Sequence, residues 1–424
     1  MLIEKWRKLD NSAKLFPIIS NKRFSTVFRI SVILKEKIHP EILKEATEIT
    51  LNKYSSFKVR LKKGFFWYYL EFNAKEVIIE EENSYPCKYI DKYTNNDYLL
   101  KVTYFENKIN MDVFHSLTDG NTATDFFKEL VYNYLELTHK ADKCFVSRGD
   151  KRIVENNTED SYIKNYNKKL QGNNSTKKAY ILQGKPLPFY AIGVIHGLID
   201  LMQLKQICKE KGTTVTQYLT AVLIKAIYEA NYKLHSNNKP IKVCIPVNLK
   251  KYFSSTTLTN FFSYITLEAQ TKNSFLESFD KILEFVKQDF QKRLRQEEIE
   301  KTMAGNVKLG NNLLIRAIPL FLKQIILKIG YIEIRKYTTT TFSNIGRMGV
   351  LPEYKQYIDN FLFLIAPEQA EKIKCSACSY ENNIVFTFTS TLEDIRIQEY
   401  FFNFLEKQNI CVRIESNGVY DVIS

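Results

Sequence analysis

The sequence lacks the short motifs that identify many nucleotide-dependent and metal-dependent enzymes. It contains no Walker A loop, no GxGxxG fingerprint, no GxSxG elbow and no HExxH pair. These absences remove the usual patterns for a bound nucleotide, a serine hydrolase and a zinc protease. Only five histidines are present, and no two of them have the spacing of a metal-binding pair. We therefore expect no catalytic metal and no bound cofactor.

Long apolar runs are also missing. No stretch of about 18 consecutive apolar residues occurs, so we expect no membrane span. The N-terminal stretch MLIEKWRKLDNSAKLFP has no apolar centre of the kind found in signal peptides. Cysteines number seven, an odd count, and they are scattered. We expect a cytoplasmic protein whose cysteines are reduced.

One cysteine pair, Cys375 and Cys378 in the stretch CSAC, has the spacing of a metal or redox site. A closed zinc site needs four ligands, and no second pair is present. The pair also lies in sequence typical of a strand, where a thiolate would gain nothing from a helix N-terminus. We favour a structural role for both cysteines over metal binding.

The composition is that of a globular protein with a basic surface. The 424 residues indicate about two domains, and 45% hydrophobic with 25% charged residues is an ordinary balance. The net charge of +14 favours anionic partners, such as anionic lipid, a phosphorylated cofactor or an acidic carrier protein. No zinc-finger spacing, RNP-like sequence or long Lys/Arg block appears, so we expect no nucleic-acid partner. The plainest interpretation is a generally solvated basic surface.

Strand and helix patterns alternate in both halves of the chain. A polar, Asn- and Lys-rich region over 138–188 separates the halves and is the best candidate for a linker. The sequence therefore predicts two α/β sandwiches, over residues 1–175 and 176–424. Strands are predicted at 24–34, 57–61, 65–72, 98–105, 109–114, 189–196, 241–248, 261–270, 338–343, 360–366, 373–380 and 383–390, with a terminal strand pair near 416–418. Helices are predicted at 40–54, from 121, at 200–211 and 215–232, within 274–300, near 311–329 and near 394–408.

The apolar segment 311–329 includes the cations Arg316, Lys323 and Lys328. Two interpretations remain open. The segment is a helix that lies on a membrane surface, which would give a peripheral membrane contact, or an amphipathic helix packed on a sheet. We favour the second.

The stretch FHSLTDG, residues 114–120, is the best candidate for chemistry. A predicted strand leads directly to His115, and a helical pattern begins at Asn121. A histidine at a strand end can face a cleft and act as a general base near neutral pH. Asp119 can fix the turn, and Gly120 would allow a positive φ angle or the close approach of a ligand. An ordinary turn histidine is the alternative, and a cysteine nucleophile paired with His115 also stays open.

HSLTDG resembles the HxxxDG signature of the chloramphenicol acetyltransferase-like superfamily, which includes condensation domains of peptide synthetases and alcohol acetyltransferases. Residues 245–265, IPVNLKKYFSSTTLTNFFSYI, resemble its P-V-[ND]-[LM]-R and N-F segment. Residues 340–352, TTFSNIGRMGVLP, resemble the S-N-x-G segment that lines its active-site tunnel. The three segments occur in the family's order, so the resemblance covers nearly the whole chain. It is closest to bacterial alcohol acetyltransferase-like enzymes.

The sequence departs from the family at several points. Phe114 stands where condensation domains have the first of two histidines, and Lys250 stands where the family often has arginine. The DFGWG motif of plant acyltransferases is absent.

The resemblance implies a pseudo-dimer of two chloramphenicol acetyltransferase-like subdomains with an active-site tunnel between them. His115 would take a proton from a small hydroxyl or amine acceptor, which would then attack the thioester of acyl-CoA. Asp119 and Gly120 would brace the motif, with Arg347 as the ionic partner of Asp119. Ser343 or Asn344 would stabilise the oxyanion, and Asn260 would shape the loop of the second half.

The donor is not fixed by the sequence. A basic surface suits the phosphates of acyl-CoA and an acidic acyl or peptidyl carrier protein equally well. A third possibility is a non-catalytic member of the superfamily that binds an acyl or other small-molecule ligand. We expect the protein to be a monomer.

Overall fold

The computed structural model describes residues 6–140, 157–170, 177–188, 191–235, 237–271 and 274–421. The predicted boundary between residues 175 and 176 and the start of the strand predicted at 189–196 lie outside these residues. The strands are β1 (Trp6–Lys8), β2 (Val27–Leu34), β3 (Val59–Lys63), β4 (Tyr68–Phe72), β5 (Ile79–Glu81), β6 (Leu100–Phe105), β7 (Lys108–Phe114), β8 (Gly193–Asp200), β9 (Ile241–Asn248), β10 (Phe262–Ala269), β11 (Thr340–Arg347), β12 (Ile358–Ile365), β13 (Ile373–Tyr380), β14 (Asn383–Ser390) and β15 (Val412–Ser416). The α-helices are α1 (Phe16–Ile19), α2 (Pro40–Lys53), α3 (Gly120–Thr138), α4 (Ser161–Lys164), α5 (Leu201–Glu210), α6 (Val215–Ala230), α7 (Phe279–Arg293), α8 (Gln296–Asn311), α9 (Leu313–Ala317), α10 (Leu320–Ile334) and α11 (Arg396–Glu406).

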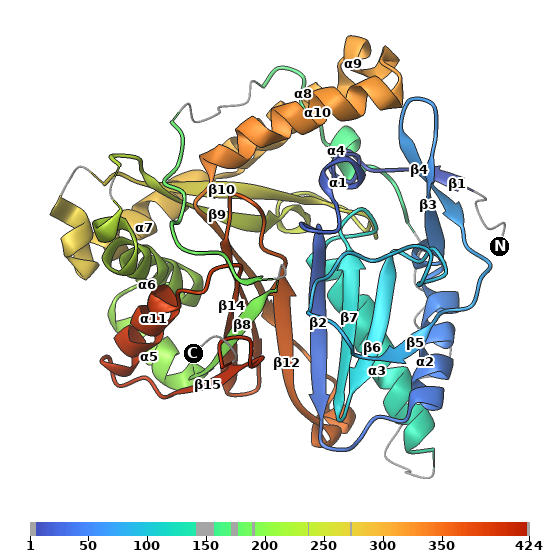
Figure 1. Cartoon of the computed structure of the whole chain (residues 1–424), viewed down its shortest axis with the longest axis horizontal. Coiled ribbons are helices and arrows are strands. Elements are labelled where there is room, and N and C mark those ends of the chain that lie inside the picture. Colours follow the sequence, from blue (N-terminus) through green and yellow to red (C-terminus); the bar gives the residue numbers. More distant parts are fainter. Residues whose placement is uncertain are drawn as a thin grey trace.

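Two large sheets form the centre of the molecule (Figure 1). One has five strands in the order β12-β2-β7-β6-β5, and the other has seven in the order β10-β9-β11-β13-β14-β8-β15. Helices α2 and α3 pack together beside the first sheet, while α5, α6, α7 and α11 lie beside the second (Figure 1). Each sandwich has its own buried core. The predicted two-part α/β architecture is confirmed.

The two sheets do not divide the chain into two consecutive halves. Strand β12 comes from the second half of the sequence but pairs antiparallel with β2 in the first sheet. Its outer carbonyl groups accept hydrogen bonds from side chains of β13 and β14, which covers an edge that would otherwise be open. The bonds run from Ser376 Oγ to Phe363 O, from Cys378 Sγ to Phe361 O and from Thr389 Oγ1 to Ile365 O. The boundary at residue 175 stays a prediction. Strand β12 lies after this boundary in the sequence but belongs to the sheet formed by strands that precede it.

Several elements differ from the prediction. The helix predicted within 274–300 is a short 3₁₀ turn followed by α7 and α8. The helix predicted near 311–329 divides into α9 and α10 at Pro319, because proline disfavours a helical conformation in the residue before it. The expected terminal strand pair is the single strand β15, which pairs with β8. Strand β1 and helix α1 were not predicted, and α1 carries Phe16, whose ring is stacked on His115.

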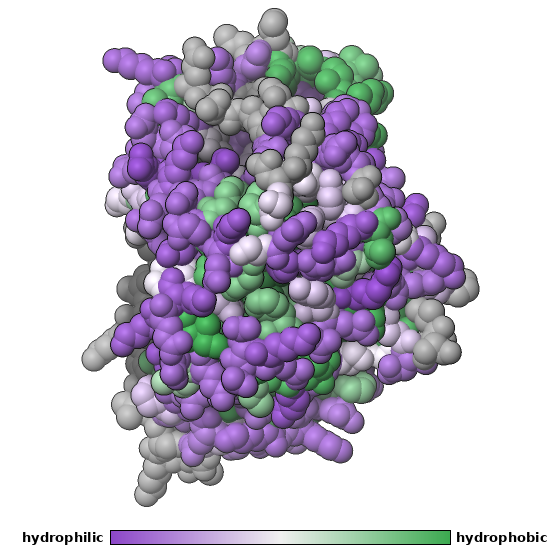
Figure 2. All heavy atoms as spheres, turned by 90° about the vertical axis from the view of Figure 1, so that its left-hand side faces the viewer, coloured by the Kyte–Doolittle hydropathy of each residue, from purple (hydrophilic) through white to green (hydrophobic). Residues whose placement is uncertain are grey.

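Most of the surface shown in Figure 2 is hydrophilic, and hydrophobic atoms gather at its upper right edge. The top of that view is the end of the molecule at which α8, α9 and α10 lie in Figure 1. None of the helices in the described ranges has both the length and the apolar composition that crossing a bilayer requires.

Candidate active site

His115 lies at the end of β7, in the turn that leads into α3. Its backbone N–H donates to the carbonyl oxygen of Thr26, at 3.0 Å, just before β2 begins. Three aromatic rings surround the imidazole. Phe16 of α1 is stacked on it with a centroid distance of 4.6 Å, Phe28 of β2 is edge-on at 5.2 Å, and Phe262 of β10 is at 5.1 Å. The ring is therefore held by elements from both halves of the chain.

The electrostatic surroundings of His115 keep it neutral. Burial lowers the pKa of the imidazole, because a charged ring would lose its hydration among the phenylalanines. The negative charges of Asp119 and Asp10 oppose this effect only in part. A neutral imidazole can accept a proton, which is the state that a general base needs.

Asn260 fixes which imidazole nitrogen carries the proton. Its Nδ2 group donates to the carbonyl oxygen of His115 at 3.0 Å and to Asp10 Oδ2 at 3.0 Å. Because both partners are acceptors, the amide must place its Oδ1 atom toward His115 Nδ1, at 2.9 Å. Nδ1 is then the donor, and Nε2 keeps its lone pair. Asn260 is fully buried and its polar atoms are bonded to His115 and Asp10, so its contacts are those of a residue that orients His115, and its role as a substrate or oxyanion contact stays a prediction.

Asp10 is the residue of the site that sequence reasoning missed. Its Oδ1 atom accepts from Ser12 Oγ and from Ala13 N, both at 2.8 Å. Its Oδ2 atom accepts from both the side chain and the backbone of Asn260. The bonds to Ser12 and Ala13 are local and typical of an aspartate in a turn. Nothing in the local sequence indicates the contact with residue 260, which is 250 positions away.

Asp119 joins the two halves through backbone groups, and the predicted ion pair with Arg347 is not formed. Its Oδ1 atom accepts from Thr122 N at 3.0 Å and so caps α3, while Oδ2 accepts from Phe261 N at 3.0 Å. The carboxylate is buried, and Arg347 is exposed at the end of β11. The cation at this junction is Lys250, whose Nζ atom donates to Thr122 Oγ1 at 2.9 Å. Because both carboxylate oxygens of Asp119 accept hydrogen bonds from backbone N–H groups, the carboxylate does not need an arginine as a partner.

Asp119→Asn is expected to reduce the free energy of unfolding by about 1–3 kcal/mol. Asparagine keeps one oxygen for Thr122 N–H, but its amide NH₂ faces the buried donor of Phe261 and leaves that donor unsatisfied. Urea denaturation measures the loss. Asp125→Asn is the control, since Asp125 is an exposed residue of the same helix, and its effect should stay within about 0.5 kcal/mol. Equal midpoints for both variants would contradict this role of Asp119.

Gly120 does not adopt a positive φ angle, which was one of the two reasons expected for its glycine, while the close approach of a ligand stays a prediction. Its φ angle is not in the left-handed region. A Cβ atom at this position would make ordinary contacts, at 3.5 Å from Ile345 Cγ2 and 3.8 Å from Phe363 Cζ. The glycine thus marks the point where β11 and β12 meet the start of α3. Through this contact, residues 340–352, the third segment that resembles the family, reach the motif at 114–120.

Ser343 and Asn344 point to opposite faces of β11. Asn344 faces α6, where its Nδ2 atom donates to Thr216 Oγ1 at 3.0 Å, and its Oδ1 atom accepts from Gly346 N at 2.9 Å. Adjacent residues of a strand alternate between its faces, so Ser343 points away from α6. Because the polar atoms of Asn344 are already bonded, Ser343 is the better candidate for contact with a substrate.

A cavity of about 500 Å³ lies close to the backbone that holds His115. Its walls come from both halves of the chain and carry the basic residues Lys22, Arg23, Lys88 and Lys372. Ser25 lines it and is the direct neighbour of Thr26, the residue that binds the His115 backbone. The remaining lining residues are Phe24, Tyr85, Cys87, Tyr89, Gly184, Pro186, Leu187, Ala191, Ile192, Ala366, Pro367, Glu368, Gln369 and Thr391.

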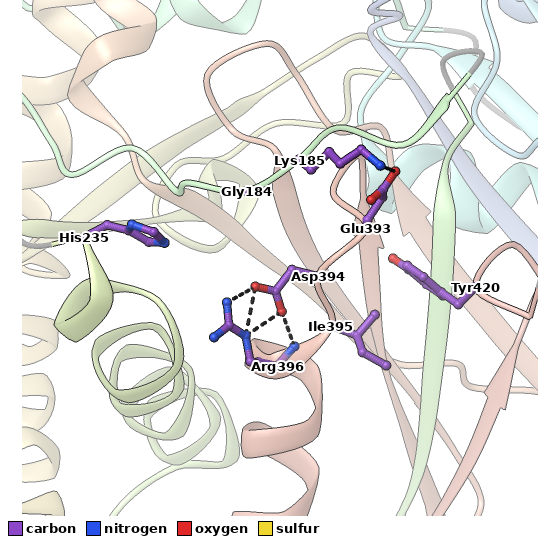
Figure 3. A pocket seen from close by; sticks show the side chains of 8 residues that line it. All are labelled: Gly184, Lys185, His235, Glu393, Asp394, Ile395, Arg396 and Tyr420. Carbon is purple, nitrogen blue, oxygen red and sulfur yellow. Dashed lines mark hydrogen bonds and ion pairs between the residues drawn. The ribbon is translucent and has the colours of Figure 1, made fainter. Parts of the chain in front are cut away.

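A second cavity, of about 570 Å³, contains none of the predicted site residues (Figure 3). Its charged groups pair with one another. Asp394 forms an ion pair with Arg396, and Glu393 Oε1 lies 3.0 Å from Lys185 Nζ. His235 stands apart from both pairs in Figure 3. The arrangement offers no base held by an orienting partner, so we do not assign it to catalysis.

Cys375 and Cys378 do not share a site. They are three residues apart on β13 and belong to different cores, Cys375 to that of the second sandwich and Cys378 to that of the first. Burial raises the pKa of Cys378 to about 12 and raises that of Cys375 as well. Both are therefore thiols, which are poor metal ligands. No cluster of three potential metal-ligating side chains occurs within the described ranges.

Comparison with known proteins agrees with this architecture. Residues 197–407 match the model of the family described as alcohol acetyltransferase. Residues 197–407 belong to the alcohol acetyltransferase family. The matched region includes the segments at 245–265 and 340–352, whereas His115 lies outside it. The resemblance to the chloramphenicol acetyltransferase-like superfamily is thus confirmed. No curated protein matches the sequence.

Several solved structures have the same fold as this protein, and they come from proteins with different substrates. TRI101 of F. sporotrichioides, solved with coenzyme A and T-2, is 10% identical with a TM-score of 0.61, covering 96% of this chain and 99% of its own. The first condensation domain of the CDA synthetase is 11% identical with a TM-score of 0.60, covering 96% of each chain. The wax ester synthase/diacylglycerol acyltransferase of Marinobacter aquaeolei VT8 is 12% identical with a TM-score of 0.58, covering 95% and 98%. At these identities the likeness establishes the fold alone.

Proposed function

We propose that this protein transfers an acyl group from acyl-CoA to a hydroxyl group of a small acceptor, with His115 as the general base. The observation that carries the proposal is the Asn260 contact, which makes Nδ1 the protonated nitrogen of a neutral imidazole. Family membership supports acyl transfer as the reaction class. An amine acceptor would use the same base, because the acceptor proton is removed in the same way.

The reaction needs one proton acceptor and no covalent enzyme intermediate. Nε2 of His115 takes the proton of the acceptor hydroxyl while the oxygen attacks the thioester carbonyl carbon. The resulting tetrahedral intermediate carries negative charge on the former carbonyl oxygen, which the Ser343 hydroxyl could stabilise by donating a hydrogen bond. The carbon–sulfur bond then breaks, and the imidazolium returns its proton to the departing thiolate. The products are the ester and free CoA.

The basic cavity beside Thr26 supports a phosphorylated donor. Lys22, Arg23, Lys88 and Lys372 surround it, and Glu368 is the acidic residue among its lining residues. Glu368 is engaged with Lys374 and Tyr331. Phosphate groups of CoA, or of the phosphopantetheine arm of a carrier protein, suit such a cluster of cations. The charge of the cavity therefore supports both donors, and the family supports acyl-CoA as the first one to test.

Release of free thiol from a panel of donors tests the proposal directly. Acetyl-CoA, longer acyl-CoA thioesters and an acylated carrier protein are each combined with alcohols and amines of different size. We expect acceptor-dependent thiol release with at least one acyl-CoA and an alcohol. Release only from the carrier protein would assign the protein to condensation-like chemistry. Binding without any release would indicate a non-catalytic member of the superfamily.

The pH dependence of kcat/KM should show an acidic limb centred below pH 6.5. Burial lowers the pKa of His115 from its ordinary value of 6.5, so the base stays unprotonated at lower pH than a free imidazole would. Activity is then present at neutral pH and falls as the pH drops through the lowered pKa. Initial rates at subsaturating acceptor, between pH 5 and 8, measure the limb. A limb centred above pH 6.5 would contradict a histidine base whose pKa is lowered by its surroundings.

A further inference from the structure

Helix α10 has its polar and apolar sides reversed relative to an ordinary surface helix. Two of its polar side chains, Lys323 and Gln324, turn inward. Lys323 is almost fully buried and donates from Nζ to the carbonyl oxygen of Phe66 at 2.9 Å, and Gln324 donates to Tyr68 Oη at 2.6 Å. A helix on the surface of a protein in water normally does the opposite.

The outward side of α10 is aliphatic and aromatic. Seven of the nineteen large hydrophobic side chains that are exposed in the described residues lie on this helix, each between 43% and 63% exposed. They are Phe321, Leu322, Ile325, Ile326, Ile329, Ile332 and Ile334. A contiguous apolar surface of this kind normally meets an apolar partner.

The tip of the β3–β4 hairpin extends the same surface. Phe65 and Phe66 are exposed, and the carbonyl oxygen of Phe65 accepts from Leu320 N at 2.8 Å. Trp67 follows them, with Lys323 Nζ 3.7 Å from its ring centroid. We name the surface formed by α10 and residues 65–66 the α10 face. It lies at the top of Figure 1, where the hairpin and α10 reach the same end of the molecule.

The charges around the α10 face are predominantly positive. Lys328 is exposed between Ile325 and Ile329, and Arg316 of α9 and Lys63 of the hairpin are exposed beside it. The nearby acid of the helix, Glu333, forms ion pairs with Lys336 and Lys178. Burial, with the charges of Lys14 and Arg316, lowers the pKa of Lys323 to about 8, as expected where cations gather.

We propose that the α10 face docks on the surface of an anionic phospholipid bilayer. Aliphatic side chains enter the acyl-chain boundary, while the surrounding lysines and arginine meet the phosphate groups. A second copy of the chain fits the face less well. A two-fold contact would bring Lys328, Arg316 and Lys63 toward the same residues of the other copy, and like charges repel.

The position of the face gives the docking a consequence for the active site. Helix α10 packs against α1, and α1 carries Phe16, the ring stacked on His115. A docked protein therefore holds its histidine one short helix away from the bilayer. The docking itself does not depend on the proposed acyl transfer and can be measured in the absence of any acyl donor.

The two tryptophans of the chain make the test specific, because Trp6 and Trp67 both lie at this end of the molecule. Full-length protein is titrated with vesicles of phosphatidylcholine, with or without phosphatidylglycerol, and tryptophan emission is followed together with co-sedimentation. We expect a blue shift and vesicle binding that are stronger with phosphatidylglycerol. Brominated lipid should quench the emission.

Ile325→Asp/Ile329→Asp should weaken vesicle partitioning by at least about tenfold. The matched control is Met202→Asp/Ile414→Asp, which adds the same charge at exposed apolar positions on α5 and β15. Lys328→Glu should remove the preference for phosphatidylglycerol. Circular dichroism confirms that each variant is folded. Absence of wild-type binding, or equal binding by the test and control pairs, would overturn the proposal. So would a wild-type dimer in sedimentation velocity that the Ile325/Ile329 variant alone converts to monomer, because the face would then bind a second copy.

Discussion

His115→Ala is expected to lower kcat by about 10²–10⁴-fold while the protein stays folded. The substitution removes the imidazole that takes the acceptor proton in the proposed reaction, and the two bound substrates then react without this base. Proximity of the substrates still contributes to the rate, so some residual activity is expected. Acceptor-dependent thiol release under saturating donor measures the change.

The design of this experiment depends on separating catalysis from folding. His235→Ala is the control, since His235 is exposed and lines the cavity of Figure 3, away from the predicted site. Its activity should match the wild type. His115→Gln adds a second test, because glutamine can still bind the Asn260 amide but cannot accept a proton. A folded His115→Ala protein with near-complete activity would exclude the general-base role.

The local patterns of the sequence were sufficient to predict the strand, turn and helix around His115. Apolar Ile109, Met111 and Val113 alternate with polar residues in β7, and the helical periodicity after residue 120 is regular. Both depend on side chains that repeat at short, fixed spacing, and such patterns can be read from a single sequence. The resemblance of three ordered segments added the two-sandwich arrangement, which periodicity alone does not give.

Contacts between distant segments could not be predicted in the same way. The partner of Asp119 was expected to be a charged side chain, but it is a pair of backbone N–H groups. An aspartate before a helical pattern can indicate the cap on Thr122 N–H, but the donor from Phe261, 142 positions away, leaves no trace in residue identity. Asp10 and Asn260 are likewise ordinary polar residues until the fold places them in contact.

Helix α10 shows a different limit of sequence reasoning. Its apolar residues were expected to pack on a sheet, because that is the usual fate of an apolar stripe. Here the hairpin tip supplies polar acceptors to Lys323 and Gln324, and these bonds hold the polar side of the helix inward. The periodicity alone gives an amphipathic helix, but not which of its sides faces the protein.

Breaking the link from Asp10 through Asn260 to His115 is the second large effect that we expect. Asn260→Ala should lower kcat by about 10²–10³-fold, because the imidazole loses the acceptor that holds the proton on Nδ1. The KM for the acceptor should change little, since Asn260 is buried behind the ring. Nitrogen-15 NMR of labelled histidine reports the tautomer directly, and a purely structural residue would not change it.

Asp10→Asn tests the outer end of the same chain with the smallest possible change of shape. The new amide places a donor against the two donors of Asn260, which disturbs the orientation of that side chain. We expect kcat to fall by roughly 10–100-fold. Removing the negative charge of Asp10 also removes an influence that raises the pKa of His115, so the acidic limb of kcat/KM should move to lower pH. An Asp10→Asn enzyme with an unchanged rate, an unchanged limb and the wild-type tautomer would show that Asp10 only folds the N-terminal turn.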